Sequence, residues 1–331
     1  MHMTAPASRP AAGPSRAAGP EAAGPGATGP GTAPPEDARG TGSAVWAALG
    51  IVYVVWGSTY LAIRVAVETM PPLLSASARF LVAGLLLAAL VAWRQGPAAL
   101  RVNRRQLGSA VLVGLLLLVG GNGMVVLAER SVPSGLAALL VASVPLWVVV
   151  LRRLSGQRTP RATVGGVLMG LLGLLVLTSP GLSGEVRLSG LLMVVAGALV
   201  WAFGSFLAGR LPMPASPVTA SVYEMLAAAV GAGVLAVVRH EPQGLDVGAI
   251  STRSWLALAY LITFGSLVAF TAYAWLLQQA PLPLVATYAY VNPVVAVVLG
   301  WLILDEPLTW PIVVGGAIVV GGVCLVVRTE R

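Results

Sequence analysis

Long apolar segments alternate with short polar ones from about residue 44 to the end of the 331-residue chain. The longest stretch without Asp, Glu, Lys, Arg or His runs from residue 254 to residue 304, 51 residues in all. A helix needs about 20 apolar residues to cross a bilayer. This stretch therefore holds two spans, divided at the polar segment QQAPLP over residues 278–283. The pattern predicts an all-α polytopic membrane protein.

Proline- and glycine-containing turns separate the apolar segments and indicate ten transmembrane helices. The expected spans are 44–64, 72–93, 107–128, 134–151, 163–179, 188–209, 216–238, 254–277, 283–304 and 310–327.

The first 42 residues differ from the rest because they contain no Val, Ile, Leu, Phe, Tyr or Trp. Such a segment cannot bury enough apolar surface to offset the entropy lost on ordering. We expect a disordered, Ala/Gly/Pro-rich cytoplasmic tail over residues 1–42, either a passive extension or a regulatory segment. It lacks the apolar core of a signal peptide.

The charges indicate a membrane topology rather than a nucleic-acid partner. The chain is 10% charged, against about 25% in soluble domains. Its net charge of +8 comes from Arg, without any Lys, and no basic patch is interleaved with aromatic residues. With the N-terminus inside, cytoplasmic segments hold fourteen arginines and outer segments five. This bias predicts a multi-pass inner-membrane protein with both termini cytoplasmic.

The chain also resembles itself at offsets of 146 to 150 residues. TYLAIR over residues 59–64 is similar to SFLAGR over 205–210, and Gly165-Gly166 matches Gly315-Gly316. The expected repeats are residues 43–180 and 188–328, each with five spans. An odd number of spans inverts the second copy in the membrane, an arrangement typical of transporters with a central binding site. A duplicated bundle without transport is the alternative.

Motifs along most of the chain resemble those of EamA-type permeases of the drug/metabolite transporter superfamily. They are WGSTYLAIR (56–64), MPPLL (70–74), RF (79–80), GNGMV (121–125), VPSGLAALLVASVP (132–145), FGS (264–266) and ATYAYVNPVV (286–295). The last motif, with WAFGS (201–205) and YEML (223–226), is most similar to the YedA-like subgroup. The resemblance implies a ten-helix, two-repeat exporter of small metabolites, amino acid-like solutes or drugs. The turn GQRT at 156–159 lacks the acidic residue that the family often has there.

Two ionisable residues lie deep within predicted spans, where charge costs about 2.5–3.5 kcal/mol and usually faces a cavity or a partner. Arg79 is a candidate for binding a substrate carboxylate or another anion. Glu224 is a candidate for binding an ammonium group or for carrying a proton in coupled transport. A structural ion pair is the alternative for both, and hydrogen bonding to carbonyls of neighbouring helices is a further alternative for Arg79.

Polar residues beside helix-breaking prolines form a second group of candidates. Pro145 and Pro293 each remove a hydrogen bond from a span, and breaks in both repeats point to a binding site and to hinges. Simple kinks that shape the packing of the helices are the alternative. Tyr288 and Asn292 precede Pro293 and lie four residues apart, hence on one face of the helix. Asn122, between two glycines, either contacts substrate or bonds a neighbouring helix.

Trp56 and Trp201 lie deeper than an interfacial aromatic belt requires and are expected to line the cavity or the belt. Gly190, Gly197 and Gly204 repeat every seven residues, which favours close helix packing over a homodimer face.

The sequence offers no enzyme, metal or cofactor site. Cys324 lies within the last span, and neither of the two histidines has a usable partner. We therefore expect a secondary transporter that exports a small molecule across the lipid bilayer by alternating access. A non-transporting membrane receptor or assembly partner is the alternative, and a channel is disfavoured because the spans carry no rings of charge.

Overall fold

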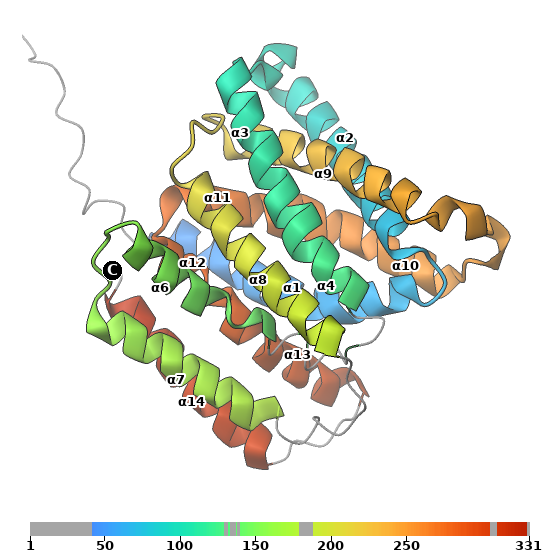
Figure 1. The fold of residues 1–331 in the computed structure, drawn as a ribbon. Helices are drawn as coiled ribbons and strands as arrows, with labels where there is room; N and C mark the ends of the chain where they lie inside the picture. Colours follow the sequence, from blue (N-terminus) through green and yellow to red (C-terminus); the bar gives the residue numbers. More distant parts are fainter. Residues whose placement is uncertain are drawn as a thin grey trace, which may run out of the picture. The chain divides into compact units, whose positions relative to one another are not determined.

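The computed structural model describes residues 42–128, 132, 137, 140–178, 188–304 and 310–329. These residues fall within one compact unit, Arg39–Arg331. Residues 1–41 of the predicted tail, most of the first half of the fourth predicted span and residues 179–187 and 305–309 lie outside the described residues. In the described ranges every regular element is helical (Figure 1).

The first half of the chain contains α1 (Ser43–Val67), α2 (Pro72–Gln95), a short 3-10 turn (Pro97–Leu100), α3 (Arg104–Gly114), α4 (Asn122–Ala128), α6 (Val144–Leu154) and α7 (Arg161–Thr178). The second half contains α8 (Leu188–Ala208), α9 (Pro217–Val238), 3-10 turns at Glu241–Gly244 and Val247–Ala249, α10 (Thr252–Tyr260), α11 (Thr271–Gln279), α12 (Leu282–Val285), α13 (Tyr288–Leu304) and α14 (Trp310–Thr329).

Two of these helices continue through π-helical segments. Leu115–Gly121 joins α3 to α4, and Leu261–Phe270 joins α10 to α11. Each joined helix is long and apolar enough to cross a membrane, as are α1, α2, α8 and α9. These six helices, counted over the described residues, make the chain a polytopic helical membrane protein.

Local sequence favours the start of three of the helices. Asn103 accepts from the amide of Gln106, whose side chain accepts from the Asn103 amide, so α3 starts with a complete capping box. Pro72 and Pro217 occupy first-turn positions of α2 and α9, where a proline costs no helical hydrogen bond.

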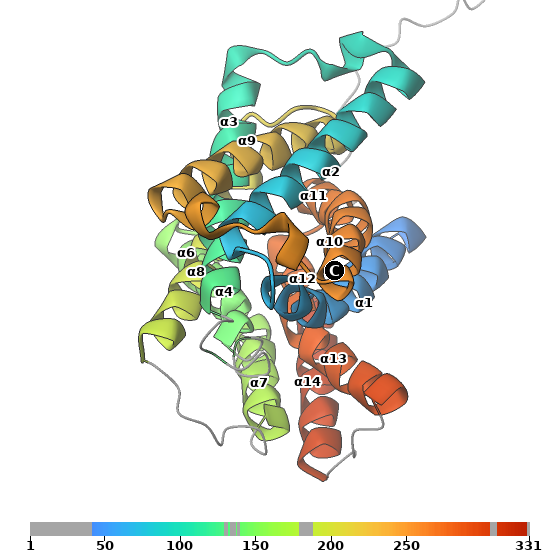
Figure 2. The same cartoon turned by 90° about the vertical axis from the view of Figure 1, so that its right-hand side faces the viewer.

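Helices from the two halves of the chain pack against each other throughout. α1 contacts α10, the Leu261–Phe270 segment and α13, whereas α8 contacts the Leu115–Gly121 segment, α4 and α6. α2 packs along α9, and α7 packs along α14, as Figures 1 and 2 both show.

The contact between α7 and α14 is made through glycines. A Cβ atom at Gly166 would lie 2.8 Å from the Gly322 carbonyl oxygen, and one at Gly322 would lie 2.7 Å from the Gly166 oxygen. We call this contact, through Gly166, Gly170, Gly173 and Gly322, the glycine seam. Small residues let membrane helices approach to backbone contact.

Two of the three glycines spaced by seven in α8 also pack within the chain. A Cβ atom at Gly197 would lie 3.0 Å from the Gly121 oxygen, and one at Gly204 would lie 3.0 Å from Leu116 Cβ. These contacts join α8 to the helix that contains α3 and α4, which favours the packing interpretation for Gly197 and Gly204.

Helices are interrupted close to both predicted hinge prolines. Residues 142–143 form a turn before α6, in which Pro145 is the second residue. Residues 286–287 form a turn between α12 and α13, but Pro293 lies inside α13. Ser143 and Thr287 each donate a hydroxyl hydrogen bond of 2.6 Å to the carbonyl three residues earlier. The second interruption therefore lies about two turns before its proline.

Candidate functional site

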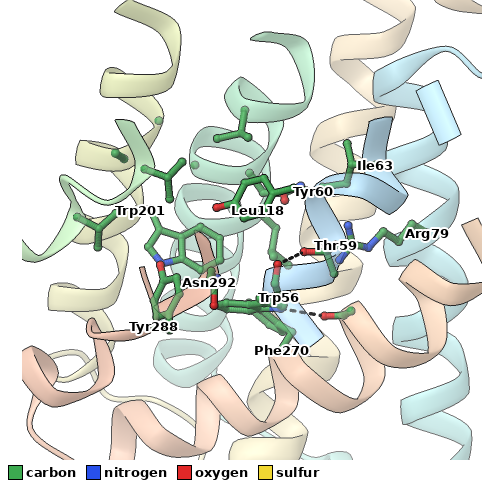
Figure 3. Close-up of a pocket in the computed structure, with 18 of the residues that line it drawn as sticks. Trp56, Thr59, Tyr60, Ile63, Arg79, Leu118, Trp201, Phe270, Tyr288 and Asn292 are labelled. Carbon is green, nitrogen blue, oxygen red and sulfur yellow. Dashed lines mark hydrogen bonds between the residues drawn. The ribbon is translucent and has the colours of Figure 1, made fainter. Parts of the chain in front are cut away.

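A cavity of about 70 Å³ lies among α1, α2, α4, α6, α8, α13 and both π-helical segments (Figure 3). Both halves of the chain contribute to its wall. The polar and aromatic lining residues are Trp56, Thr59, Tyr60, Arg79, Phe80, Asn122, Trp201, Phe270, Tyr288 and Asn292. This set contains six of the seven residues predicted to bind substrate, and Glu224 is the one that does not line the cavity.

Arg79 supplies the positive charge of the cavity and is only 7% exposed. Its Nε donates a 2.8 Å hydrogen bond to Oγ of Ser266, a fully buried residue of the second π-helical segment. The adjacent Gly265 leaves room for the guanidinium, since a Cβ atom there would lie 2.9 Å from Arg79 Nη2. The Gly265–Ser266 pair thus forms a seat for the arginine.

Asn122 lies at the first residue of α4, directly after the first π-helical segment. Its Nδ2 atom is buried and has no hydrogen-bond partner within the described residues. Asn122 and Arg79 line both the main cavity and a second cavity of about 20 Å³ that reaches Val67 and Ser75. Together with Ile63, which also lines both cavities, the two residues lie at the boundary between them.

Aromatic rings form the opposite side of the cavity from Arg79, as Figure 3 shows. The centroid of the Trp56 ring lies 5.5 Å from that of the Trp201 ring and 5.0 Å from that of the Tyr288 ring, and both pairs have edge-to-face geometry. Tyr273 packs against all three of these rings. Such pairs stabilise the packing beyond the apolar area that they bury.

Hydrogen bonds orient the two tryptophans. Trp56 Nε1 donates to the Gly265 carbonyl at 3.3 Å, and Trp201 Nε1 donates to the Tyr273 hydroxyl at 3.0 Å. The same hydroxyl lies 2.6 Å from Oγ of Ser205. Both indole N–H groups therefore have partners, and the rings present mainly apolar surface to the cavity.

Asn292 joins α13 to α1. With its amide nitrogen oriented toward acceptors, it donates to the carbonyls of Tyr288 at 3.0 Å and Tyr53 at 3.2 Å. Tyr53 also lies 2.6 Å, oxygen to oxygen, from Oγ1 of Thr287 at the interruption before α13. These bonds give Asn292 a structural role beside its place in the cavity wall.

Glu224 is buried at 2% exposure on α9, away from the lining of the cavity. Its backbone packs directly on α3, because a Cβ atom at Gly114 would clash with the Glu224 carbonyl oxygen. Its Oε2 has no hydrogen-bond partner in the described part of the chain. Tyr273 of the aromatic wall lies within electrostatic range of this carboxyl.

Sequence reasoning missed Ser266, Gly265 and Tyr273. The motif FGS at 264–266 was visible, but nothing in it indicated that its serine would meet Arg79 from a distant helix. Tyr273 lies in a long apolar run, where a buried tyrosine hydroxyl can find a partner on any neighbouring helix. In the described ranges no three His, Cys, Asp or Glu residues gather at a metal-binding distance.

The sequence model of the EamA-like transporter family matches the chain twice, over residues 43–179 and 188–328. The chain belongs to the EamA-like transporter family. It is a multi-pass membrane transporter and not an enzyme.

The chain is 42% identical over 259 residues to the uncharacterized inner membrane transporter YedA of Escherichia coli K12, covering 77% of this chain and 81% of that protein. It is 27% identical over 284 residues to a probable amino-acid metabolite efflux pump of Salmonella typhimurium, covering 82% of this chain and 91% of the relative. A solved crystal structure has the same fold, with a TM-score of 0.71 at 22% identity over 87% of this chain and 98% of that one.

Proposed function

We propose that the protein is a secondary transporter with ten transmembrane helices in two inverted five-helix repeats. The packing supports this arrangement, because α1 contacts the second-half helices α11 and α13, and α8 contacts the first-half helices α4 and α6. Exchanging the two repeats converts one set of contacts into the other. The two family matches, over residues 43–179 and 188–328, support the same division.

The observation that carries the proposal is a cavity at the interface of the two halves. Trp56, Arg79 and Asn122 of the first half meet Trp201 and Tyr288 of the second around one space. Alternating access by inverted repeats opens such a central site first to one side of the membrane and then to the other. A cavity between the two halves supports a central substrate site of the kind that this mechanism requires.

We propose export of a small organic solute, with both termini in the cytoplasm. The arginine distribution supports this orientation. The name of the Salmonella relative, a probable amino-acid metabolite efflux pump, supports the direction.

The two buried charges have separate proposed roles. Arg79 binds an anionic group of the substrate in the cavity. Glu224 carries a coupling proton, and Tyr273 of α11 lies within electrostatic range of its carboxyl group. If transport by Glu224→Gln keeps the pH dependence of the wild type, the proton-coupling role is excluded.

Comparative metabolite profiling of the growth medium tests the function. Cells expressing the wild type are compared with cells expressing Arg79→Ala and Glu224→Ala at matched membrane levels. A solute enriched outside only with the wild type establishes export and identifies a substrate. The same profile in all strains would favour the alternative of a receptor or assembly partner.

A further inference from the structure

We infer that the cavity binds a small organic anion without an ammonium group, and that Ser266 positions Arg79 to receive it. The inference rests on the proposed transport function and specifies the substrate class of that same site.

The charge balance of the cavity selects for an anion. Arg79 is charged, and none of the other described lining residues is acidic or basic. The Arg79 guanidinium makes no ion pair within the described ranges, and Glu224 lies outside the lining. A buried charge without a counter-charge is costly, and a bound carboxylate would offset that cost. A bound ammonium would add a second positive charge and find no carboxylate in the wall.

Ser266 fixes which edge of the guanidinium faces the ligand. Because Nε is occupied by the serine hydroxyl, the two Nη nitrogens are left for a carboxylate. Two parallel N–H groups on one plane match the two oxygens of a carboxylate. Gly265 keeps the space beside Nη2 clear, where a side chain would displace it. Both seat residues belong to a π-helical segment, a form of helix frequent at functional sites.

Asn122 supplies a second donor at the boundary between the two cavities. Its Nδ2 is buried and has no partner among the residues that the structure describes, which is costly unless an acceptor arrives. A substrate oxygen bound to Arg79 would approach this boundary, since both residues line the same two cavities. The amide and the guanidinium are therefore complementary to one acceptor-rich head group.

The rest of the ligand is small and apolar. The indole N–H groups of Trp56 and Trp201 already have partners, so the rings offer apolar contact. The cavity of about 70 Å³ is smaller than the roughly 150 Å³ space that admits benzene in an apolar protein core. A short-chain monocarboxylate fits these limits.

The test uses four nearly isosteric probes, namely propionate, propanol, propylamine and alanine, titrated into the purified wild-type protein by calorimetry. We expect propionate to bind at least about tenfold more tightly than each of the others, since a charge-assisted contact is gained only with the anion. Equal affinity for propylamine or alanine would overturn the assigned class, as would failure of propionate to bind.

Variants of Ser266 test whether this serine positions Arg79 or is needed only for folding of the protein. We expect Ser266→Ala to reduce the preference for propionate over propanol severalfold, and Ser266→Thr, which retains the hydroxyl, to restore it. Ser109→Ala is the matched control, because Ser109 is buried and its hydroxyl donates to the Arg105 carbonyl of its own helix, away from the cavity lining. An unchanged preference in Ser266→Ala would overturn the role of the serine.

The two proposals fail in distinguishable ways. If cells export a cationic or zwitterionic solute in the profiling experiment, transport stands and the anion class is wrong. If propionate binds through Arg79 and no solute crosses the membrane, the substrate class stands and the transport function is wrong.

Discussion

The glycine seam and the seat of Arg79 use the same amino acid for opposite purposes. At the seam, Gly166 and Gly322 bring backbone against backbone, each blocking the space for the other's Cβ atom. At the cavity, Gly265 makes room for the end of the Arg79 side chain, and Gly121 makes room for the Trp201 ring. Gly166 and Gly322 hold two helices in backbone contact, whereas Gly265 and Gly121 leave space for side chains that face the proposed ligand.

This difference determines what an added methyl group does. A clash with backbone can be relieved only by moving a helix, and overpacking of this kind is destabilising. A clash with the end of an arginine is relieved by moving the side chain. We therefore expect seam variants to lose stability and cavity variants to lose function while they remain folded.

The largest effect is expected at the seam. Gly322→Ala should lower the free energy of unfolding by about 1–3 kcal/mol because its methyl group meets the backbone of α7. Thermal unfolding of the purified protein measures this change. Gly316→Ala on the same helix is the control, since its Cβ atom meets nothing within 4 Å. Equal melting temperatures for the two variants would contradict the backbone contact.

Gly265→Ala should separate function from stability. We expect the melting temperature to change little and transport to fall by about 10- to 100-fold, because small displacements of a positioned group have effects of that size. Transport is measured in proteoliposomes with the exported solute. Gly108→Ala, at a site with open space around its Cβ atom, should transport like the wild type.

Trp201→Phe keeps an aromatic ring beside Trp56 but removes the N–H group that donates to Tyr273. Loss of this bond should cost about 1 kcal/mol and loosen the cavity wall. We expect a severalfold weaker affinity for the transported solute. Trp93→Phe is the control because Trp93 is 79% exposed. Comparable affinity in both variants would argue against an oriented indole.

The smallest effect is expected at the interruption before α13. Tyr53→Phe removes the contact with Thr287 and should cost about 0.5–1.5 kcal/mol. Thr287 keeps its bond to the Leu284 carbonyl, so the local fold should persist. Chemical unfolding of Tyr53→Phe and of the wild type measures the change in the free energy of unfolding. Equal stabilities would contradict a stabilising contact between α1 and the turn before α13.

Helix positions followed closely from the sequence where apolar runs begin at proline. The expected spans 72–93 and 216–238 correspond to α2 (Pro72–Gln95) and α9 (Pro217–Val238). The π-helical segments were not predicted, because a run of Leu, Val and Gly is equally compatible with an α-helix. Their position is set by packing against α8 and α1.

The sequence indicated which polar residues within the apolar spans could belong to the site, but it did not indicate which residues of other helices they would contact. Arg79 and Asn122 were identifiable because polar groups in hydrocarbon need a partner or a cavity. The same rule selected Glu224, which the structure places on α9 outside the cavity lining. Ser266 could not be assigned to Arg79, since 187 residues separate them and only the folded chain brings them together.

The most direct test of alternating access is the accessibility of one cavity residue from each side of the membrane. Val125 lines the cavity, and cysteine can replace it in a chain whose natural Cys324 is changed to Ser. Oriented vesicles containing a transport-competent variant are treated with a membrane-impermeant thiol reagent on either face. We predict that the cysteine reacts from both faces and that bound substrate slows both reactions. Reaction from one face only, with and without substrate, would contradict the alternating-access account.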